Sequence, residues 1–560
     1  MERFRNSHQS IFPLIIKIIS LVFAFAIVCN VYAENITAES VIPAYSASCV
    51  VVSDVPKIAD AMEKSPVWQE IGKYAKEQMK KDNENSSFMT KLAINHIWDL
   101  ITISTEQIAI ANIDPTKMSS PTVIIDLGSS KNLVETAQKI IQILVDEKKS
   151  EIVTNAGTYL NVSYGIVKPE SRFAFLENLF VFAPGQKEFE AVVNVYRDKE
   201  PSIMEDPKYI TAYNKVFRDG QAFLYFNSEL TGSVSKILNQ QEQLKALGTG
   251  AVKAISWRID LLSPTKDQEI FFLSGDNQKI MSHLLSMPGS VLSPHIIPAS
   301  SSDIFFALTA SDIASAWDIY LDQLRNSLDI EQYSKFQETI SNFEMGLGLN
   351  LKNDVLSSIT GEFGVSVSMP KAEGESFSPT SGLLLFLGIK DREKCQLIVE
   401  KILVGKQIEK TQYKNVDIYH IKSLDNPQGL FGYTFAGDLL IFGGMKNLMA
   451  IIDEDTPLIA SERFSQIGSR LPQSYAMLFY IDLAKLLALR AAPLAQGGEN
   501  WANMMQSLGS IGGCSVFDGQ GYRMKITANQ GKSWLEAIGD IISSTRKESS
   551  TTEGGEIKND

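Results

Sequence analysis

The sequence predicts an α+β protein made of two tandem copies of a roughly 250-residue unit, mostly antiparallel sheet with helices packed on one face. Two observations carry this prediction. A strand, a helix and a β-hairpin follow one another in residues 121–185, and the same pattern returns in residues 382–444. Short, hairpin-like connections favour antiparallel pairing. We expect a first repeat over 42–290 and a second over 296–545.

The central helix of each copy has one predicted buried face. Its apolar residues recur at spacings of three and four, as Leu133, Ala137, Ile140, Ile141 and Leu144 in the first copy and as Cys395, Val399, Ile402 and Leu403 in the second. The hairpins that follow, at 172–185 and 430–444, place Phe182 and Phe442 at the same position.

Each copy opens with a strand and a helix. In the first copy the strand is predicted at 48–52, and the helix begins at Pro56 with Asp54 as a cap. The opening helix of the second copy repeats the apolar positions of the first: Ile313, Ala314 and Trp317 stand where Ile58, Ala59 and Met62 stand. The charged segment from Asp329 to Glu344 predicts a solvated helix face.

The next strands are predicted at 101–112 and 359–369, with Glu106 and Glu362 in matching places. After the hairpins come two aromatic strands, 221–227 and 476–482. They end in Asn227 and Asp482, short polar residues that favour capping of a following helix.

Two further strands and a last helix close each copy. The last helices are predicted at 279–287 and 533–543. The tail 547–560 combines Ser, Thr, Gly and charged residues without an apolar face, so we expect it to be disordered.

The N-terminus is typical of a secretory signal peptide over residues 1–33. Arg3, Arg5 and Lys17 precede an apolar run, and short side chains precede an expected cleavage between Ala33 and Glu34. An exported protein, periplasmic or extracellular, follows from this interpretation. The alternative is an uncleaved segment that anchors the protein to the inner membrane.

The composition restricts the classes of partner and of covalent cross-link. A net charge of −13 disfavours nucleic acid, whose phosphates must be neutralised by basic side chains. Three cysteines remain after residue 33, namely Cys49, Cys395 and Cys514, and an odd, sparse set predicts buried small hydrophobes rather than a disulfide framework.

No motif in the sequence predicts catalytic, cofactor-binding or metal-ligating residues. Zinc-protease and paired-cysteine spacings, a nucleophile elbow and a phosphate-binding loop are all missing. Glu106 and Glu362 belong to different copies, which favours a duplicated structural residue over an acid–base pair. The aromatic strands predict core or, where a sheet face is uncovered, an apolar groove lined by Phe223, Tyr225, Phe305 and Phe479.

Two segments of the second copy carry a family resemblance. IPASSSDIFFALTASDI (297–313) and GLGLNLKNDVLSSITGEFGVSVS (346–368), together with the signal peptide, resemble the exported bacterial domain-of-unknown-function family thirty-three-fifty-two. The family's recurring positions are held here by Gly348, Leu349, Asp354, Leu356, Gly361 and Glu362. The first copy keeps Glu106 but has Thr105 in place of the glycine. The resemblance implies bacterial export and no reaction, ligand or catalytic residue.

The sequence thus predicts a non-enzymatic envelope protein, without cofactor, that binds or scaffolds an unknown envelope partner. Two alternatives stay open: a carrier of a lipid or other apolar ligand, and a hydrolase of unrecognised type. An uncovered aromatic sheet face would favour the carrier of an apolar ligand. A covered face would instead place the same aromatic residues in an ordinary core.

Overall fold

The computed structural model describes part of the chain, divided into two compact units. The described residues are 36–70, 106–114, 121–128, 152–167, 170–216, 219–229, 252–274, 291–310, 313–369, 382–422, 431–453, 455–483, 485, 509–529 and 531–540. Unit 1 comprises Met1–Ser235, Lys253–Leu273 and Ser533–Gly554, and unit 2 comprises Lys236–Val252, Ser274–Lys532 and Gly555–Asp560.

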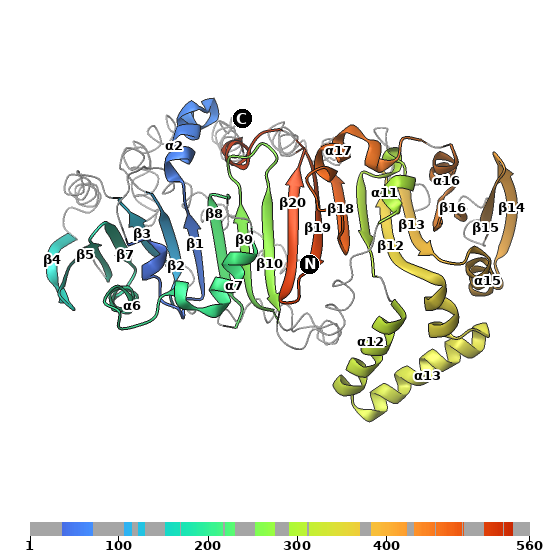
Figure 1. The fold of residues 1–560 in the computed structure, drawn as a ribbon, viewed down its shortest axis with the longest axis horizontal. Coiled ribbons are helices and arrows are strands. Elements are labelled where there is room, and N and C mark those ends of the chain that lie inside the picture. The colour runs from blue at the N-terminus through green and yellow to red at the C-terminus, as the bar shows by residue number, and fades with distance from the viewer. Residues whose placement is uncertain are drawn as a thin grey trace, which may run out of the picture. The chain divides into compact units, whose positions relative to one another are not determined.

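Unit 1 is built on a sheet whose strand order is β4-β5-β6-β7-β3-β2-β1-β8-β9-β10 (Figure 1). The strands are β1 (Ser48–Val52), β2 (Ile108–Asn112), β3 (Thr122–Asp126), β4 (Ile152–Tyr159), β5 (Val162–Val167), β6 (Ser171–Leu176), β7 (Leu179–Ala183), β8 (Ala222–Asn227), β9 (Val252–Ile259) and β10 (Gln268–Ser274). Its helical segments include η1 (Glu39–Val41), α2 (Val55–Lys64), α6 (Gln186–Tyr196), η2 (Ile203–Glu205) and α7 (Pro207–Lys215).

Unit 2 has the strand order β14-β15-β16-β17-β13-β12-β11-β18-β19-β20. The strands are β11 (Ile304–Leu308), β12 (Ile359–Val367), β13 (Leu383–Ile389), β14 (Gln407–Tyr413), β15 (Val416–Lys422), β16 (Phe431–Ala436), β17 (Leu439–Gly444), β18 (Met477–Asp482), β19 (Ser510–Phe517) and β20 (Gly521–Ala528). Its helical segments include α11 (Ser293–Ile296), η4 (Ala299–Ser301), α12 (Ile313–Ser327), α13 (Ile330–Leu347), η5 (Leu351–Val355), η6 (Leu356–Ser358), α15 (Arg392–Ile402), α16 (Met445–Ile452), η7 (Leu458–Ala460) and α17 (Glu462–Gly468).

The predicted α+β class with mostly antiparallel sheet is confirmed. Every strand pair with a defined register within the two units is antiparallel, and the order of strands along the sheet is the same in both units. The origin of this likeness by duplication, and the repeat ranges 42–290 and 296–545, remain predictions.

Helices lie on both faces of each sheet, which corrects the prediction of helices on one face. In unit 1, α2 belongs to one core cluster with Ile108 and Ile125, whereas α6 and α7 belong to another with Ala109 and Ile124. Successive residues of a strand point to opposite faces. Strands such as β2 and β3, which are buried at nearly every position, therefore need cover on both sides.

One hairpin in each unit is absent from the predicted elements. β4 and β5 are joined through Leu160 and Asn161, and β14 and β15 through Lys414 and Asn415. Both central residues of each turn have positive φ, the conformation of a type I′ turn, which matches the twist of a hairpin.

The segment after β20 belongs to unit 1. Residues 534–540 are helical, Leu535 is buried, and the Trp68 indole Nε1 donates to the Leu535 carbonyl at 3.0 Å. Ser533 and Glu536 form a reciprocal cap at the start of this helix. The sequence had grouped these residues with the second repeat, since chain order alone does not show on which core an apolar helix packs.

Several predicted segments lie outside the described residues. They are the signal peptide 1–33 with its cleavage site at Ala33 and Glu34, the first copy's central helix within 129–145, its last helix at 279–287, and the tail 547–560. Within the described part of the chain, no helix has the length and apolar character required to cross a membrane.

Candidate functional site: an open apolar sheet face in unit 2

The sheet of unit 2 has one face that its helices cover only in part. We call this the outer face and define it by the side chains that β11, β12, β13 and β18 direct to that side: Ile304, Phe306, Leu308, Phe363, Val365, Val367, Leu383, Leu385, Leu387, Met477, Phe479 and Ile481. Every one of them is apolar. Phe363 is 42% exposed and Leu385 43% exposed, and the other ten are half-buried.

The same face of unit 1 is closed. Strand registers align the two units: Ile108 lies opposite Val52 and Ile125, as Phe363 lies opposite Leu308 and Leu387. By the same registers, Val123 corresponds to Leu385. Ile108 and Val123 are each only 1% exposed. The two units therefore have the same strand order but differ in whether this face is covered.

Helix α2 contributes to the cover in unit 1. Val55, Ile58 and Met62 of α2 are fully buried in one cluster with Ile108 and the other strand residues of that face. Trp68 and Leu535 belong to the same cluster. An amphipathic helix with its apolar stripe on a sheet is the ordinary way to bury such a face.

In unit 2 the corresponding helix, α12, buries Ala316 and Leu324 but leaves other apolar positions half-buried. Ile313, Ala314 and Trp317, which match buried residues of α2 in sequence, are all half-buried. Helices α12 and α13 extend beyond the edge of the sheet at which β12 begins, instead of lying across the strands (Figure 1). We call residues 313–347 the arm.

Helix α13 has no buried residue along its 18 positions. Its apolar side chains are half-buried or exposed, with Ile330 88% and Met345 70% exposed. This confirms the solvated helix predicted between Asp329 and Glu344. The helix begins at the Asp329 cap and ends at Gly348, whose φ of 60° is the left-handed conformation that favours glycine.

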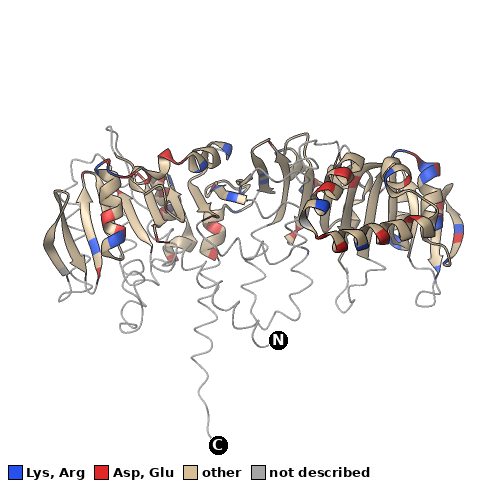
Figure 2. Ribbon diagram, turned by 90° about the horizontal axis from the view of Figure 1, so that it is seen from below, with Lys and Arg blue, Asp and Glu red and all other residues tan. Residues whose placement is uncertain are grey.

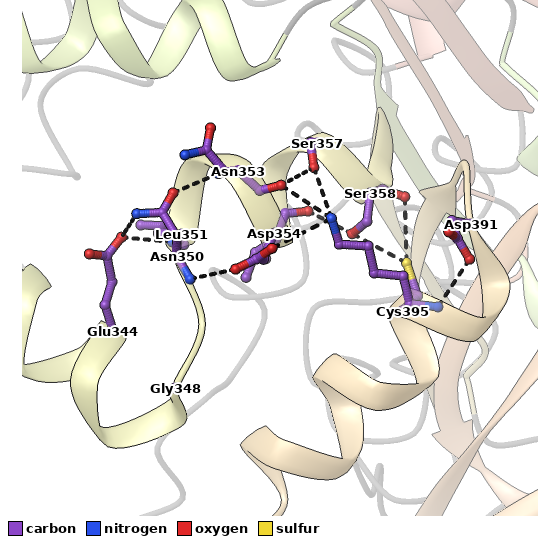
Figure 3. Close-up of polar contacts among 12 residues, drawn as sticks. Glu344, Gly348, Asn350, Leu351, Asn353, Asp354, Ser357, Ser358, Asp391 and Cys395 are labelled. Atoms are coloured by element: carbon purple, nitrogen blue, oxygen red, sulfur yellow. Dashed lines mark hydrogen bonds and ion pairs between the residues drawn. The ribbon is translucent and has the colours of Figure 1, made fainter.

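The segment from Glu344 to Asp354, which includes the motif residues Gly348, Leu349 and Asp354, forms the joint between the arm and the sheet (Figure 3). The Glu344 carboxylate accepts from the backbone N–H of Leu351 at 2.7 Å and from the Asn350 side chain at 3.0 Å. The Asp354 carboxylate accepts from the backbone N–H of Asn350 at 2.8 Å. These bonds fold the chain after Gly348 into the turn η5.

Helix α15 holds the same joint from the other side. The Lys394 ammonium donates to the Asn353 carbonyl at 3.2 Å and lies 3.6 Å from the Asp354 carboxylate. An ion pair also joins η5 to the arm: the Lys352 ammonium donates to the Asp318 carboxylate of α12 at 2.6 Å. The Lys352 and Asp318 side chains are 41% and 54% exposed, so this ion pair is a weak one.

Gly361 and Glu362, the last two motif residues, fix the start of unit 2. Gly361 has φ 92°, and a Cβ there would lie 1.8 Å from the Ala310 carbonyl oxygen, so only glycine fits. The buried Glu362 carboxylate accepts from the backbone N–H groups of Leu292 at 3.0 Å and Ser293 at 2.8 Å. These two bonds explain the glutamate as a structural residue.

The predicted match of Glu106 with Glu362 is wrong by one position. Ile108 and Phe363 correspond by register, so the residue before them is Gln107 in unit 1 and Glu362 in unit 2. Gln107 makes the equivalent hydrogen bond in unit 1: its side-chain oxygen accepts from the backbone N–H of Glu39 at 3.1 Å. The similar spacing of glutamates in the sequence concealed this offset.

A buried polar cluster exists in unit 1. The Tyr209 hydroxyl donates to the Glu39 carboxylate, and burial raises the pKa of Glu39 above its ordinary value, while the Tyr209 hydrogen bond and the Arg258 charge oppose that shift. The Arg258 guanidinium lies 4.7 Å from the Phe223 ring centroid and donates to the Gly220 carbonyl, and its Nε and Nη2 have no hydrogen-bond partner among the described residues.

Unit 2 has apolar or weakly polar residues at two matching register positions of this cluster. Arg258 lies opposite Phe223, and the corresponding pair in unit 2 is Cys514 with Leu478. Buried polar side chains without a full set of partners reduce stability. Sequence reasoning missed the cluster, because its members lie far apart in the chain.

Three of the four aromatic residues proposed for a groove are core residues. Phe223, Tyr225 and Phe305 are at most 1% exposed and point to the covered faces. Phe479 lies on the outer face of unit 2, where its ring covers Gly513. The cysteines Cys49, Cys395 and Cys514 are buried, as predicted.

The predicted caps make the expected hydrogen bonds. The Asn227 side chain accepts from the Glu229 N–H at 3.2 Å, and the Asp482 side chain accepts from the Lys485 N–H at 3.1 Å. The helices predicted after them lie outside the described residues.

Unit 1 has an open pocket of about 400 Å³ beside β5 and β6. Its wall combines polar and apolar groups: Thr154, Asn161, Val162, Ser163, Gly165, Phe173, Ala174, Phe175, Leu176, Tyr196 and Arg197. The Arg197 guanidinium stacks 4.7 Å from the Tyr196 ring centroid.

Charge is concentrated away from the outer face. Figure 2 shows Lys, Arg, Asp and Glu mainly on the helices and on the β14–β15 hairpin of unit 2. The central strands of that unit are mostly tan, the colour of all other residues. The face therefore offers apolar contact and little else.

Comparison with solved structures gives weak likeness. One chain, described as "Structure of crystal form I of TP0453", has a TM-score of 0.26 and 8% identity, over 47% of this chain and 90% of that one. A second, "Structure of crystal form III of TP0453", has a TM-score of 0.22 and 12% identity, over 46% and 99%. Values this low support no conclusion about function. Comparison with curated proteins gives no match.

A family model does match. "Protein of unknown function (DUF3352)" matches residues 106–516, a range that contains the whole motif from Gly348 to Glu362 and the strands of the outer face. The resemblance seen in the second copy is thereby confirmed. The chain belongs to this family of proteins of unknown function.

Proposed function

We propose that this protein is an exported, non-enzymatic envelope protein that binds an apolar ligand on the outer face of unit 2. The observation that carries the proposal is the contrast between the two units. The corresponding sheet faces of the two units differ: Ile108 and Val123 are covered in unit 1, whereas Phe363 and Leu385 are exposed in unit 2.

The chemistry of the face selects the class of ligand. Twelve neighbouring side chains on four strands are apolar, so a bound group gains contact area but meets no side-chain hydrogen-bond partner there. Full burial of a Leu or Phe side chain contributes about 1.5–3 kcal/mol. Phe363 and Leu385 therefore retain roughly 1 kcal/mol each for a ligand that covers them. An acyl chain fits these requirements.

We also propose that the protein has no catalytic activity. This part of the proposal is supported by the structural hydrogen bonds that the polar residues near the motif make. Glu362, the most buried carboxylate of the motif, uses both oxygens to hold backbone N–H groups. Asp354 and Lys394 are likewise engaged in the joint of the arm. These hydrogen bonds give each of the side chains a structural role in holding the backbone.

Export rests on the predicted signal peptide over residues 1–33. An envelope location places the protein next to lipids, the most abundant source of acyl chains. A negatively charged chain is also poorly suited to a nucleic-acid partner.

Native mass spectrometry of protein purified from its own host tests the proposal. We expect a lipid-sized adduct on the wild type and its loss in Phe363→Asp, which places a charge on the open face. Ile402→Asp is the matched control, because Ile402 is 51% exposed on α15 and lies off the face. An adduct-free wild type, or equal adducts in all three proteins, would contradict the proposal.

A further inference from the structure

We infer that the pocket beside β5 and β6 of unit 1 binds an acidic sugar, that is, a ring that carries hydroxyl groups and one carboxylate. Its volume of about 400 Å³ lies within the range of roughly 300–1,000 Å³ that is common for small-molecule sites. Every residue of its wall belongs to unit 1. The inference is therefore independent of the apolar ligand proposed for unit 2.

The pocket lies where the pairing of β5 with β6 ends. The register of the two strands joins residues 165–167 to residues 171–173 and does not extend to residues 162–164 of β5 or 174–176 of β6. Both of these stretches contribute to the wall. Successive residues of a strand point to opposite faces, so a ligand between the two strand ends reaches side chains from both sides of the sheet.

The corresponding place in unit 2 is bridged by a hydrogen bond. The strand registers align Ser163 with Asp417 and Ala174 with Thr434. The Thr434 hydroxyl donates to the backbone carbonyl oxygen of Asp417 at 2.8 Å and so connects β16 to β15. Ala174 has no hydroxyl, and the same connection is therefore missing between β6 and β5.

Unit 2 also has one more aromatic ring at this place. The registers align Gly165 with Tyr419 and Phe173 with Tyr433. The two tyrosine rings of unit 2 stack with their centroids 4.6 Å apart and their planes 4° from parallel. In unit 1 a Cβ on Gly165 would lie 2.2 Å from the Phe173 ring, so that ring lies over the glycine. One ring thus stands where unit 2 has two, which leaves space beside β5.

Three neutral polar side chains in the wall are free to bind hydroxyl groups. Thr154, Asn161 and Ser163 are exposed, and their side chains make no hydrogen bond to other described residues. Thr154 lies in an irregularity of β4 between Val153 and Gly157, where the register with β5 shifts. A bulge at the edge of a sheet is a common way to redirect a side chain toward a site.

Arg197 supplies the single charge of the wall. It follows the last residue of α6, a helix of 11 residues, whereas α16 of unit 2 has 8. Its guanidinium stacks 4.7 Å from the Tyr196 ring centroid and makes no hydrogen bond or ion pair with other described residues. The Tyr196 hydroxyl donates to Glu177 at 3.0 Å. A guanidinium placed by stacking presents its N–H groups to a carboxylate in a bidentate geometry.

The charge of the surrounding hairpin agrees with this class of ligand. Residues 152–167 contain no charged side chain. The equivalent hairpin of unit 2 carries an ion pair, Lys410 with Asp417 at 2.8 Å. Neutral hydrogen-bonding groups, one cation and the half-buried Phe175 ring together suit a hydroxylated ring with one negative charge.

Isothermal titration calorimetry of the full chain with glucuronate tests the inference. We expect saturable binding at one site of the wild type. Glucose lacks the carboxylate and acetate lacks the hydroxylated ring, so each should bind about tenfold more weakly or less. Phe363→Asp, the variant that removes the ligand proposed for unit 2, should bind glucuronate like the wild type.

Variants of Arg197 identify the charged contact. Arg197→Met should weaken glucuronate binding by about tenfold or more and leave the weaker glucose binding unchanged. Arg197→Lys keeps the charge without the bidentate geometry and should give an intermediate affinity. Arg172→Met is the matched control, because Arg172 also stacks on a tyrosine, 5.6 Å from the Tyr164 ring centroid, but lies outside the wall.

Ala174→Thr tests the opening between the strands. It introduces the hydroxyl that connects the strands in unit 2 and should weaken glucuronate binding by about fivefold. The midpoint of thermal unfolding should stay the same or rise, which shows that the variant is folded.

Several results would overturn the inference. Undetectable glucuronate binding, or equal affinities of Arg197→Met and Arg172→Met, would exclude the pocket as its site. Acetate that binds as tightly as glucuronate would show a plain anion contact without recognition of a sugar. Palmitate that displaces glucuronate would assign the pocket to an apolar ligand.

Discussion

Ile108 and Phe363 occupy the same position of the same strand in the two units, yet Ile108 is 1% exposed and Phe363 is 42% exposed. Both lie next to a residue that holds the first turn of its unit, Gln107 in one case and Glu362 in the other. The strand is thus anchored in the same way in both units. The units differ in whether other residues cover the side chain of Ile108 or of Phe363.

The first prediction concerns the stability of the two faces. Ile108→Ala should lower the free energy of unfolding by about 2–5 kcal/mol, because it leaves a cavity in a packed core. Phe363→Ala should lower it by less than half of that, since solvent already reaches the ring. Urea unfolding followed by far-UV circular dichroism measures both. Equal losses would mean that the outer face is covered in solution.

The second prediction concerns the clamp on η5. Lys394→Ala removes the hydrogen bond to the Asn353 carbonyl and the ion pair with Asp354. We expect faster amide hydrogen exchange in 348–358 and a loss of at most about 1 kcal/mol in global stability, because the pair is partly exposed. Lys335→Ala serves as control and should leave exchange in 348–358 unchanged. Unaltered exchange in the Lys394 variant would show that the clamp does not hold the joint.

The third prediction concerns Glu362. Glu362→Gln keeps one accepting oxygen and turns an NH₂ group toward a backbone N–H, so one buried donor loses its partner. The expected loss in the free energy of unfolding is about 1–3 kcal/mol. Glu338→Gln on the exposed side of α13 should change it by less than about 0.5 kcal/mol. A neutral Glu362→Gln would refute the structural role of this motif residue.

The fourth prediction concerns Lys266, a buried ammonium with no hydrogen-bond partner among the described residues. Burial lowers its pKa from 10.5 to about 8, and the charge of Glu536 opposes this. Between pH 8 and 10.5 the unfolded chain binds more protons at this residue than the folded chain, so its contribution to stability rises with pH.

Lys266→Met should therefore stabilise unit 1 at pH 7, by an amount on the order of 1–3 kcal/mol. The gain over the wild type should shrink as pH rises through that window. Thermal unfolding of both proteins at pH 7 and at pH 10 measures the difference. A gain of the same size at both pH values would show that the lysine charge is not its cause.

The strands and hairpins could be predicted from the sequence because their signals are local. The apolar runs of β13 and β17 and the aromatic run of β8 each read as strands without knowledge of the fold. The hairpin β4–β5 gave no such signal, since NAGTYLNVSYG between 155 and 165 is polar and glycine-rich. Its turn depends on Leu160, a residue that rarely adopts a positive φ.

The open face could not be predicted, because the cover of a strand is a long-range property. Ile108 and Phe363 stand in equally apolar strands, and the arm carries the same apolar positions as α2. The polar cluster of Glu39 and Arg258 could not be predicted either, because its residues lie far apart in the sequence. The family motif could be recognised from the sequence, but its structural role could not, because it depends on the hydrogen bonds that Asp354 and Glu362 make to backbone N–H groups.

Photo-cross-linking with a diazirine-bearing palmitate analogue, followed by peptide mass mapping, tests the central claim most directly. The account predicts labels concentrated in 304–308, 359–367, 383–389 and 477–482, the strands of the outer face. Labels confined to unit 1, or equally frequent on the exposed surface of α15 at Leu397 and Ile402, would contradict it.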